Sequence, residues 1–144
     1  LTKCTPSKTR RYPGLIDLFM KLSCEPFEYG SNDCCTVPAD CVKGHYARDL
    51  MKDWRGRYAS FAGLTRIIRE AGFGDFESAF ADTMAKQGLK EAQTPNECAI
   101  GLIGILTETE ILTAPAFYSK GWWHGRSHEG PVVVKKAFRI WDKQ

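Results

Sequence analysis

The sequence predicts an α+β domain in which helices come first and a small antiparallel sheet follows. Apolar residues recur at helical spacing as far as about residue 87. Beyond Pro95 the chain changes to short runs rich in β-branched residues, separated by Gly and Pro. Such segregation of helices and strands is typical of α+β domains. Because there is no internal repeat and no linker-like tract, residues 13–144 are expected to form one domain.

Five helical segments are predicted before residue 88. The first runs from about Pro13 to Ser23, and its apolar face consists of Leu15, Ile16, Leu18, Phe19 and Leu22. After a loop over residues 24–33, a second helix begins at about Cys34 or Thr36 and stops at Gly44. Residues 47–54 are predicted to form a short helix. Ser60 caps a helix that ends at residues 71–72, and Asp75 caps one that reaches about Gln87.

Four strand-like runs follow, at residues 98–106, 111–114, 132–134 and 138–141. They are short and bounded by Gly and Pro, which favours an antiparallel sheet. The stretch 121–130 between two of these runs is interpreted as a long loop or a hairpin.

Charge and hydropathy exclude some classes of partner. The chain carries 20 Lys and Arg against 17 Asp and Glu, and this small excess argues against a nucleic-acid partner. Residues 1–12 form a basic arm that is expected to be solvated or to dock on a partner. No apolar run reaches the roughly 18 residues of a membrane-spanning helix, and the start has no apolar signal-peptide block, so a soluble protein without a membrane span is expected.

Six cysteines are present: Cys4, Cys24, Cys34, Cys35, Cys41 and Cys98. The adjacent pair and the lack of a signal peptide disfavour a disulfide framework. The cluster from Cys24 to Cys41 offers a zinc or iron-sulfur site as an alternative, but there is no C-x-x-C pair. Most of these residues are therefore expected to be buried free thiols, with no metal and no cofactor.

The run from Phe27 to Cys35 is the candidate active site. A Tyr29-Gly30 turn and an Asn-Asp pair place Cys34 where a helix should begin, and the positive end of a helix dipole favours thiolate over thiol. Cys34 is thus the candidate nucleophile, with Cys35 as the fallback, while Tyr29 and Asp33 are candidate substrate contacts. The competing interpretation makes Cys34 a small buried residue and Asp33 a helix cap.

Pro38 bears on where this helix begins. If Asp33 is the cap, Pro38 falls at the fifth helical position and removes the hydrogen bond that the Cys34 carbonyl would accept. Thr36 is the alternative cap. Cys34 would then lie in the preceding turn and lose part of the effect of the dipole.

Several motifs together resemble known proteins. They are Phe27, Tyr29-Gly30, Asn32-Asp33-Cys34-Cys35, Ala39-Asp40, Arg55-Gly56-Arg57-Tyr58, Ala99-Ile100-Gly101-Leu102-Ile103-Gly104 and Ala137-Phe138-Arg139-Ile140. With helices before a sheet, this pattern resembles the NlpC-type branch of the papain-like cysteine peptidases, which cut peptides in bacterial cell walls. It is more closely similar to a family of unknown function that phages and prophages encode among their tail genes.

The resemblance implies thiolate attack on a carbonyl, with a histidine on the first strand as base and a third polar residue to orient it. In the family, this histidine lies two residues before a glycine. The matching position here is Ala99 if that glycine is Gly101, or Leu102 if it is Gly104, and neither side chain accepts a proton. His45 would lie about 15 Å from Cys34 along the helix. His124 and His128 are the remaining candidate bases, with Glu129 as the orienting residue.

The pair Trp122-Trp123 lies between glycines and next to charged residues, so both rings are not expected in the core. Trp122, Trp123 and Arg126 are the candidate partner-binding residues.

Two functions remain open. One is a structural protein of a phage tail tip or baseplate, made in the bacterial cytoplasm, located in the virion and bound to other tail-tip or hub proteins. The other is an active peptidase or amidase that uses Cys34 on peptidoglycan during cell entry. The missing base at Ala99 favours the first.

Overall fold

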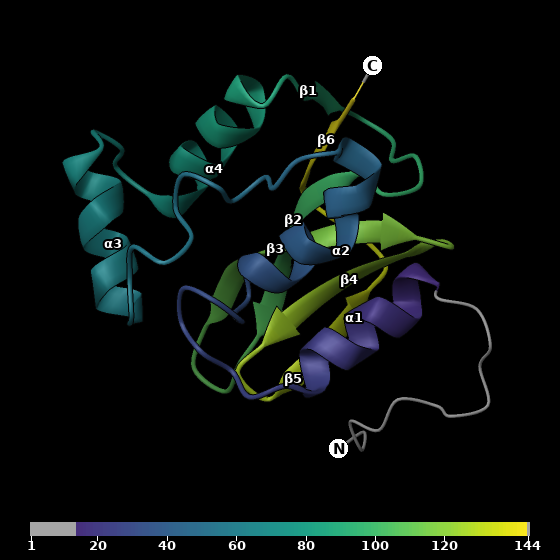
Figure 1. Ribbon diagram of the computed structural model, residues 1–144, viewed down its shortest axis with the longest axis horizontal. Coiled ribbons are helices and arrows are strands. Elements are labelled where there is room, and N and C mark those ends of the chain that lie inside the picture. Colours follow the sequence, from purple (N-terminus) through teal and green to yellow (C-terminus); the bar gives the residue numbers. More distant parts are fainter. Residues whose placement is uncertain (1–13, 144) are drawn as a thin grey trace.

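The computed structural model describes residues 14–143, so the basic arm 1–12 lies outside the described residues. This part of the chain contains four helices followed by six strands (Figure 1). The helices are α1 (Leu15–Cys24), α2 (Thr36–Tyr46), α3 (Phe61–Glu70) and α4 (Phe76–Lys86). The strands are β1 (Lys90–Ala92), β2 (Ile100–Leu106), β3 (Ile111–Ser119), β4 (Trp122–Ser127), β5 (Gly130–Val134) and β6 (Arg139–Asp142). The predicted α+β class is confirmed.

The six strands form one antiparallel sheet in the order β1-β6-β2-β3-β4-β5. Strands β2 to β5 follow one another as hairpins, and β6 returns to lie between β1 and β2. Helices α1 and α2 lie on one face of the sheet, with α2 against β3 and β4, while α3 and α4 lie to one side (Figure 1). Among the helices of residues 14–143, none combines the length and apolar character that crossing a bilayer requires.

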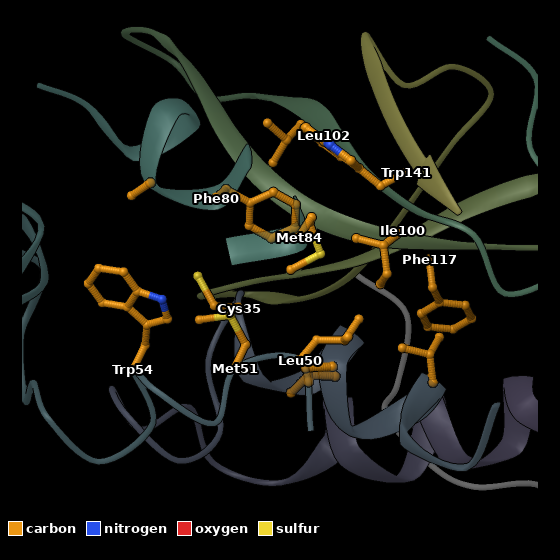
Figure 2. Packing of buried hydrophobic residues seen from close by; sticks show 14 of the residues in the cluster. Cys35, Leu50, Met51, Trp54, Phe80, Met84, Ile100, Leu102, Phe117 and Trp141 are labelled. Atoms are coloured by element: carbon orange, nitrogen blue, oxygen red, sulfur yellow. The ribbon is translucent and has the colours of Figure 1, made fainter. Parts of the chain in front are cut away.

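The main core lies between this face of the sheet and the helices. Figure 2 shows Leu50 and Met51, from the segment after α2, and Met84 of α4 gathered near side chains of the sheet. Phe117 of β3 is fully buried and meets Phe19 of α1 edge to face, with ring centroids 5.4 Å apart. Burying an aromatic ring of this size contributes about 1.5–3 kcal/mol, so α1 is held to the sheet largely by such contacts.

A second, smaller core covers the opposite face of the sheet. Trp123 of β4 is buried there and lies across Gly101 of β2, where an added Cβ would be 2.7 Å from the indole. Gly125 similarly leaves room for Ile103. These two glycines are therefore required by close packing, and not by an unusual backbone conformation.

Three predicted elements need correction. The helix predicted at 47–54 is a series of turns, in which the Asp49 carboxylate accepts hydrogen bonds from the Met51 N–H and from Arg55. Helix α2 does not stop at Gly44 but continues to Tyr46, and the left-handed Ala47 (φ 55°) ends it. Residues 122–127 form strand β4, which pairs with β5, so the hairpin interpretation of residues 121–130 is confirmed and the long loop is wrong. The short strand β1 was not predicted at all.

Candidate functional site

The carboxylate of Asp33 is buried and accepts five hydrogen bonds. Its Oδ1 atom accepts from the backbone N–H groups of Cys35 and Thr36, both at 2.9 Å, and from the Thr36 hydroxyl at 3.1 Å. Its Oδ2 atom accepts from the Gly30 N–H at 2.7 Å and from the Tyr58 hydroxyl at 2.6 Å. Only 1% of the residue is exposed. A carboxylate in such a site is satisfied by the protein itself.

These contacts determine where α2 begins. The Thr36 hydroxyl accepts a hydrogen bond from the Asp33 N–H at 2.8 Å, so Asp33 and Thr36 cap the helix start reciprocally. The helix begins at Thr36, and Pro38 falls in its first turn, where its missing N–H breaks no helical hydrogen bond. Cys34 therefore lies in the turn before the helix. Thr36 itself is the first helical residue and not the cap, because the side chain that accepts the N–H groups at the helix start is that of Asp33.

The two adjacent cysteines have different environments. Cys34 is partly buried, and its Sγ atom lies 4.0 Å from Sγ of Cys35. Cys35 packs in the main core. Its contact with the Cys34 thiol, its burial and the nearby Asp33 carboxylate raise the pKa of Cys35 well above its ordinary value. Cys35 is thus held as a thiol at neutral pH, which does not suit the fallback nucleophile.

Neither histidine of the β4 region is bonded to the thiol. His124 is buried, stacks on Phe117 with centroids 5.2 Å apart, and has its Nε2 atom 3.3 Å from the Ser119 carbonyl oxygen. Burial lowers the pKa of His124. Across residues 14–143, the Cys34 thiol makes no hydrogen bond with an imidazole. The fully buried Ala99, at the expected base position, packs with the outer core instead.

His128, at the β4–β5 turn, belongs to an aromatic group near the helix start. Its Nε2 atom lies 2.9 Å from the Tyr29 hydroxyl, and its ring stacks on Phe27 at 3.9 Å. Burial, followed by the nearby Cys34 and Asp33, raises the pKa of Tyr29. His128 and Tyr29 are therefore brought to the end of α2 that carries the thiol. Glu129 makes no hydrogen bond or ion pair with a histidine in the described part of the chain.

His45 lies at the far end of the same helix. It is in the last turn of α2, with its ring edge to face on Tyr46 at 4.8 Å. The length of α2 thus separates it from the thiol, as the sequence predicted.

The candidate partner-binding residues do not form one surface. Trp123 is buried in the outer core, and Arg126 is buried with its guanidinium donating to the carbonyl oxygens of Leu22, Ser23 and Glu25. Arg126 thus joins β4 to the carbonyl end of α1, where a cation is favoured. Trp122 alone is exposed, at 44%.

A metal site at the helix start is chemically unfavourable. The donor atoms of Asp33, Cys34 and Cys35 lie within 4.8 Å of one another. However, five hydrogen bonds already occupy the roughly four lone-pair directions of the carboxylate. The raised pKa of Cys35 also opposes the thiolate form that a metal requires.

Within residues 14–143, the other cysteines contribute no further donor set. Cys41 and Cys98 are free, and burial raises the pKa of both thiols. Cys24 is disulfide-bonded, so the expectation of free thiols is wrong for this residue.

Tyr58 is the important residue that sequence reasoning treated only as part of a turn. Burial, with the nearby Cys35 and Asp33, raises the pKa of its phenol, which therefore remains a hydrogen-bond donor to the carboxylate. Its sequence signal was its place in the Arg-Gly-Arg-Tyr motif. Gly30 completes the arrangement because a Cβ at this position (φ 89°) would lie 2.4 Å from the Tyr58 carbonyl oxygen.

These features define an α+β protein with a buried aspartate at the start of a cysteine-bearing helix. Over residues 10–142 the chain matches the family described as "Domain of unknown function (DUF6950)", and it belongs to that family. No curated protein and no solved structure matches it.

Proposed function

We propose that this chain is a structural component of a phage tail tip or baseplate, built on a papain-like NlpC-type fold that has lost its catalytic base. Two features support the choice of fold. Helix α2, which begins directly after the Cys34-Cys35 pair, packs against β3 and β4 of an antiparallel sheet, and the motifs around Cys34 resemble those of the NlpC-type peptidases. The tail assignment rests on the resemblance to the family encoded among phage tail genes.

The proposal that Cys34 is not catalytic depends on one observation. The residue at the expected base position, Ala99, is buried and cannot accept a proton, and the Cys34 thiol has no imidazole partner within residues 14–143. General-base catalysis is worth roughly 10²–10⁴ in rate, and a nucleophile without a placed base lacks this contribution. Asp33 remains useful without catalysis because it caps α2.

A second function is favoured by the Tyr29–His128 hydrogen bond. In this alternative, the Tyr29 hydroxyl, which is already hydrogen-bonded to Nε2 of His128, moves to within hydrogen-bond distance of the Cys34 thiol. It then takes the thiol proton and passes its own proton to His128. The thiolate then attacks the carbonyl carbon of a peptidoglycan amide during cell entry. The C–N bond breaks, the amine leaves with the proton returned from His128, and water hydrolyses the resulting thioester. This role requires that removal of His128 slow the reaction of Cys34.

The two proposed functions predict different rates for the reaction of Cys34 with iodoacetamide. Peptide mass spectrometry after short exposures between pH 6 and 9 would locate and count the modified thiols. We expect Cys34 to react at the same rate in the natural sequence and in His128→Gln at every pH, because in the structural role no base assists the thiol. Selective labelling of Cys34 at pH 6 that is lost in His128→Gln, together with release of peptidoglycan fragments, would establish the peptidase instead.

The location of the protein tests the structural role directly. Particles of the phage or prophage that encodes this chain are purified by density gradient, and tail fractions are analysed by mass spectrometry. We expect the chain to co-purify with the tail-tip and hub proteins. Its recovery only in the soluble fraction of the lysed host would contradict a role in the tail.

A further inference from the structure

The β2–β3 hairpin ends in an exposed surface that is both apolar and acidic. Leu106 and Ile111 lie directly opposite each other on the two strands and are 80% and 70% exposed. Between them, Glu108 and Glu110 are exposed and form no ion pair within residues 14–143. We call these four residues the acidic tip. Exposed aliphatic side chains of this size are typical of a surface that another protein covers.

The acidic tip is held in shape by its own turn. The Thr107 N–H donates to the Glu110 carbonyl oxygen at 2.8 Å, and the Thr107 hydroxyl oxygen accepts from the Glu110 N–H at 3.0 Å. A preformed hairpin loses little conformational entropy when it binds, which favours its use as a docking element.

A second exposed surface combines apolar and basic side chains. It consists of Lys120, Trp122, Val133, Lys135 and Lys136, which we call the basic patch. Trp122 is 44% exposed and Val133 is 50% exposed. The Lys135 ammonium lies 4.3 Å from the centre of the Trp122 ring, so the indole carries a cation on one face.

Few carboxylates compete for this patch. Its three lysines form no ion pair in the part of the chain that the structure describes. Glu97 is nearby, but its carboxylate accepts hydrogen bonds from the Ser119 hydroxyl and from the Lys120 backbone N–H. The patch is therefore free to receive an acidic partner.

The acidic tip and the basic patch lie at opposite ends of strand β3 (Figure 1). The nine residues of this strand, at about 3.3 Å each, separate the two turns by roughly 30 Å. One molecule can therefore use both surfaces at the same time.

We propose that the acidic tip of one copy of this chain docks on the basic patch of a second copy. The two glutamates face the three lysines, and Leu106 and Ile111 cover the exposed part of Trp122 and Val133. Two acidic tips would repel each other, so a symmetric contact between like surfaces is disfavoured. A head-to-tail contact repeats from copy to copy and produces a closed ring or a filament. This inference is independent of the proposed role in a tail.

Sedimentation velocity of the purified full chain tests this contact. Between about 10 and 500 μM at low salt, we expect species larger than the 16.2 kDa monomer that grow with concentration and shrink in 1 M salt. The tip variant Glu108→Lys/Glu110→Lys and the patch variant Lys135→Glu/Lys136→Glu should each be monomeric. An equimolar mixture of the two variants should assemble again, because each acidic surface then meets a basic one.

The mixture separates loss of a contact from loss of folding, since two misfolded proteins would not restore assembly. The control Lys52→Glu/Lys90→Glu makes the same charge change as the patch variant at exposed sites elsewhere and should assemble like the natural sequence. A natural sequence that stays monomeric throughout, or variants that remain monomeric when mixed, would overturn the proposal. Assembly of either variant alone at the natural concentration would overturn it as well.

Discussion

Removal of the Tyr58 hydroxyl tests whether the buried Asp33 carboxylate stabilises the fold. Tyr58→Phe deletes the 2.6 Å hydrogen bond to Oδ2 and leaves the aromatic ring in place. Hydrogen bonds to charged groups contribute about 1.5–3 kcal/mol. Because the carboxylate keeps four other donors, we expect a loss of about 2 kcal/mol in the free energy of unfolding.

Urea unfolding followed by circular dichroism measures this loss. With a slope of about 2 kcal/mol per M, the midpoint should fall by about 1 M while the slope stays the same. The matched control is Tyr118→Phe, because the Tyr118 hydroxyl makes no hydrogen bond within residues 14–143 and its loss should change stability by less than about 0.5 kcal/mol. If Tyr58→Phe is as stable as Tyr118→Phe, the carboxylate is not held by this phenol and the structural role argued for Asp33 fails.

Two further predictions concern the core and the pH dependence of stability. Gly101→Ala should destabilise the protein by about 1–3 kcal/mol, because the added Cβ would press on the Trp123 ring. The control is Gly74→Ala, whose Cβ meets no atom within 4 Å. Equal urea midpoints for the two variants would contradict the packing of the outer core. Burial lowers the pKa of folded His124 below its unfolded value of about 6.5, so the stability it contributes is present above pH 6.5 and is lost as pH falls through the folded pKa. His124→Phe should therefore lose less stability between pH 7 and 5 than the natural sequence. Part of the pH dependence should remain in this variant, because the pKa of His45 is also lowered. If the free energy of unfolding falls equally with pH in the two proteins, the assignment to His124 is refuted.

Local chemistry made several helix boundaries predictable. Ser60 and Asp75 were expected to cap helices, and their side chains accept hydrogen bonds from the N–H groups of Gly63 and Ser78. Capping depends on residues three positions apart, so the sequence contains the necessary information. The choice between Asp33 and Thr36 was harder because both residues take part in the same cap.

Contacts between distant segments account for the errors. The segment 47–54 is not helical because Arg55 forms ion pairs with Asp49 and with Asp40, and Asp40 lies on α2. Strand β4 was predicted only as part of a possible hairpin, because two of its inward-facing residues, His124 and Arg126, are polar. Their burial depends on partners in α1 and β3 that no local pattern reveals.

The candidate site illustrates why a motif is weaker evidence for catalysis than a placed base. An aspartate followed by cysteine at the start of a helix suits a nucleophile, but the same aspartate is needed to cap that helix whether or not the cysteine reacts. Asp33 makes five hydrogen bonds with the structure around it, so folding alone is enough to require it. The side chain of Ala99, by contrast, contributes packing in the outer core. Activity must therefore be judged from what accepts the proton of Cys34, and the reaction of that thiol in His128→Gln is the measurement that addresses it.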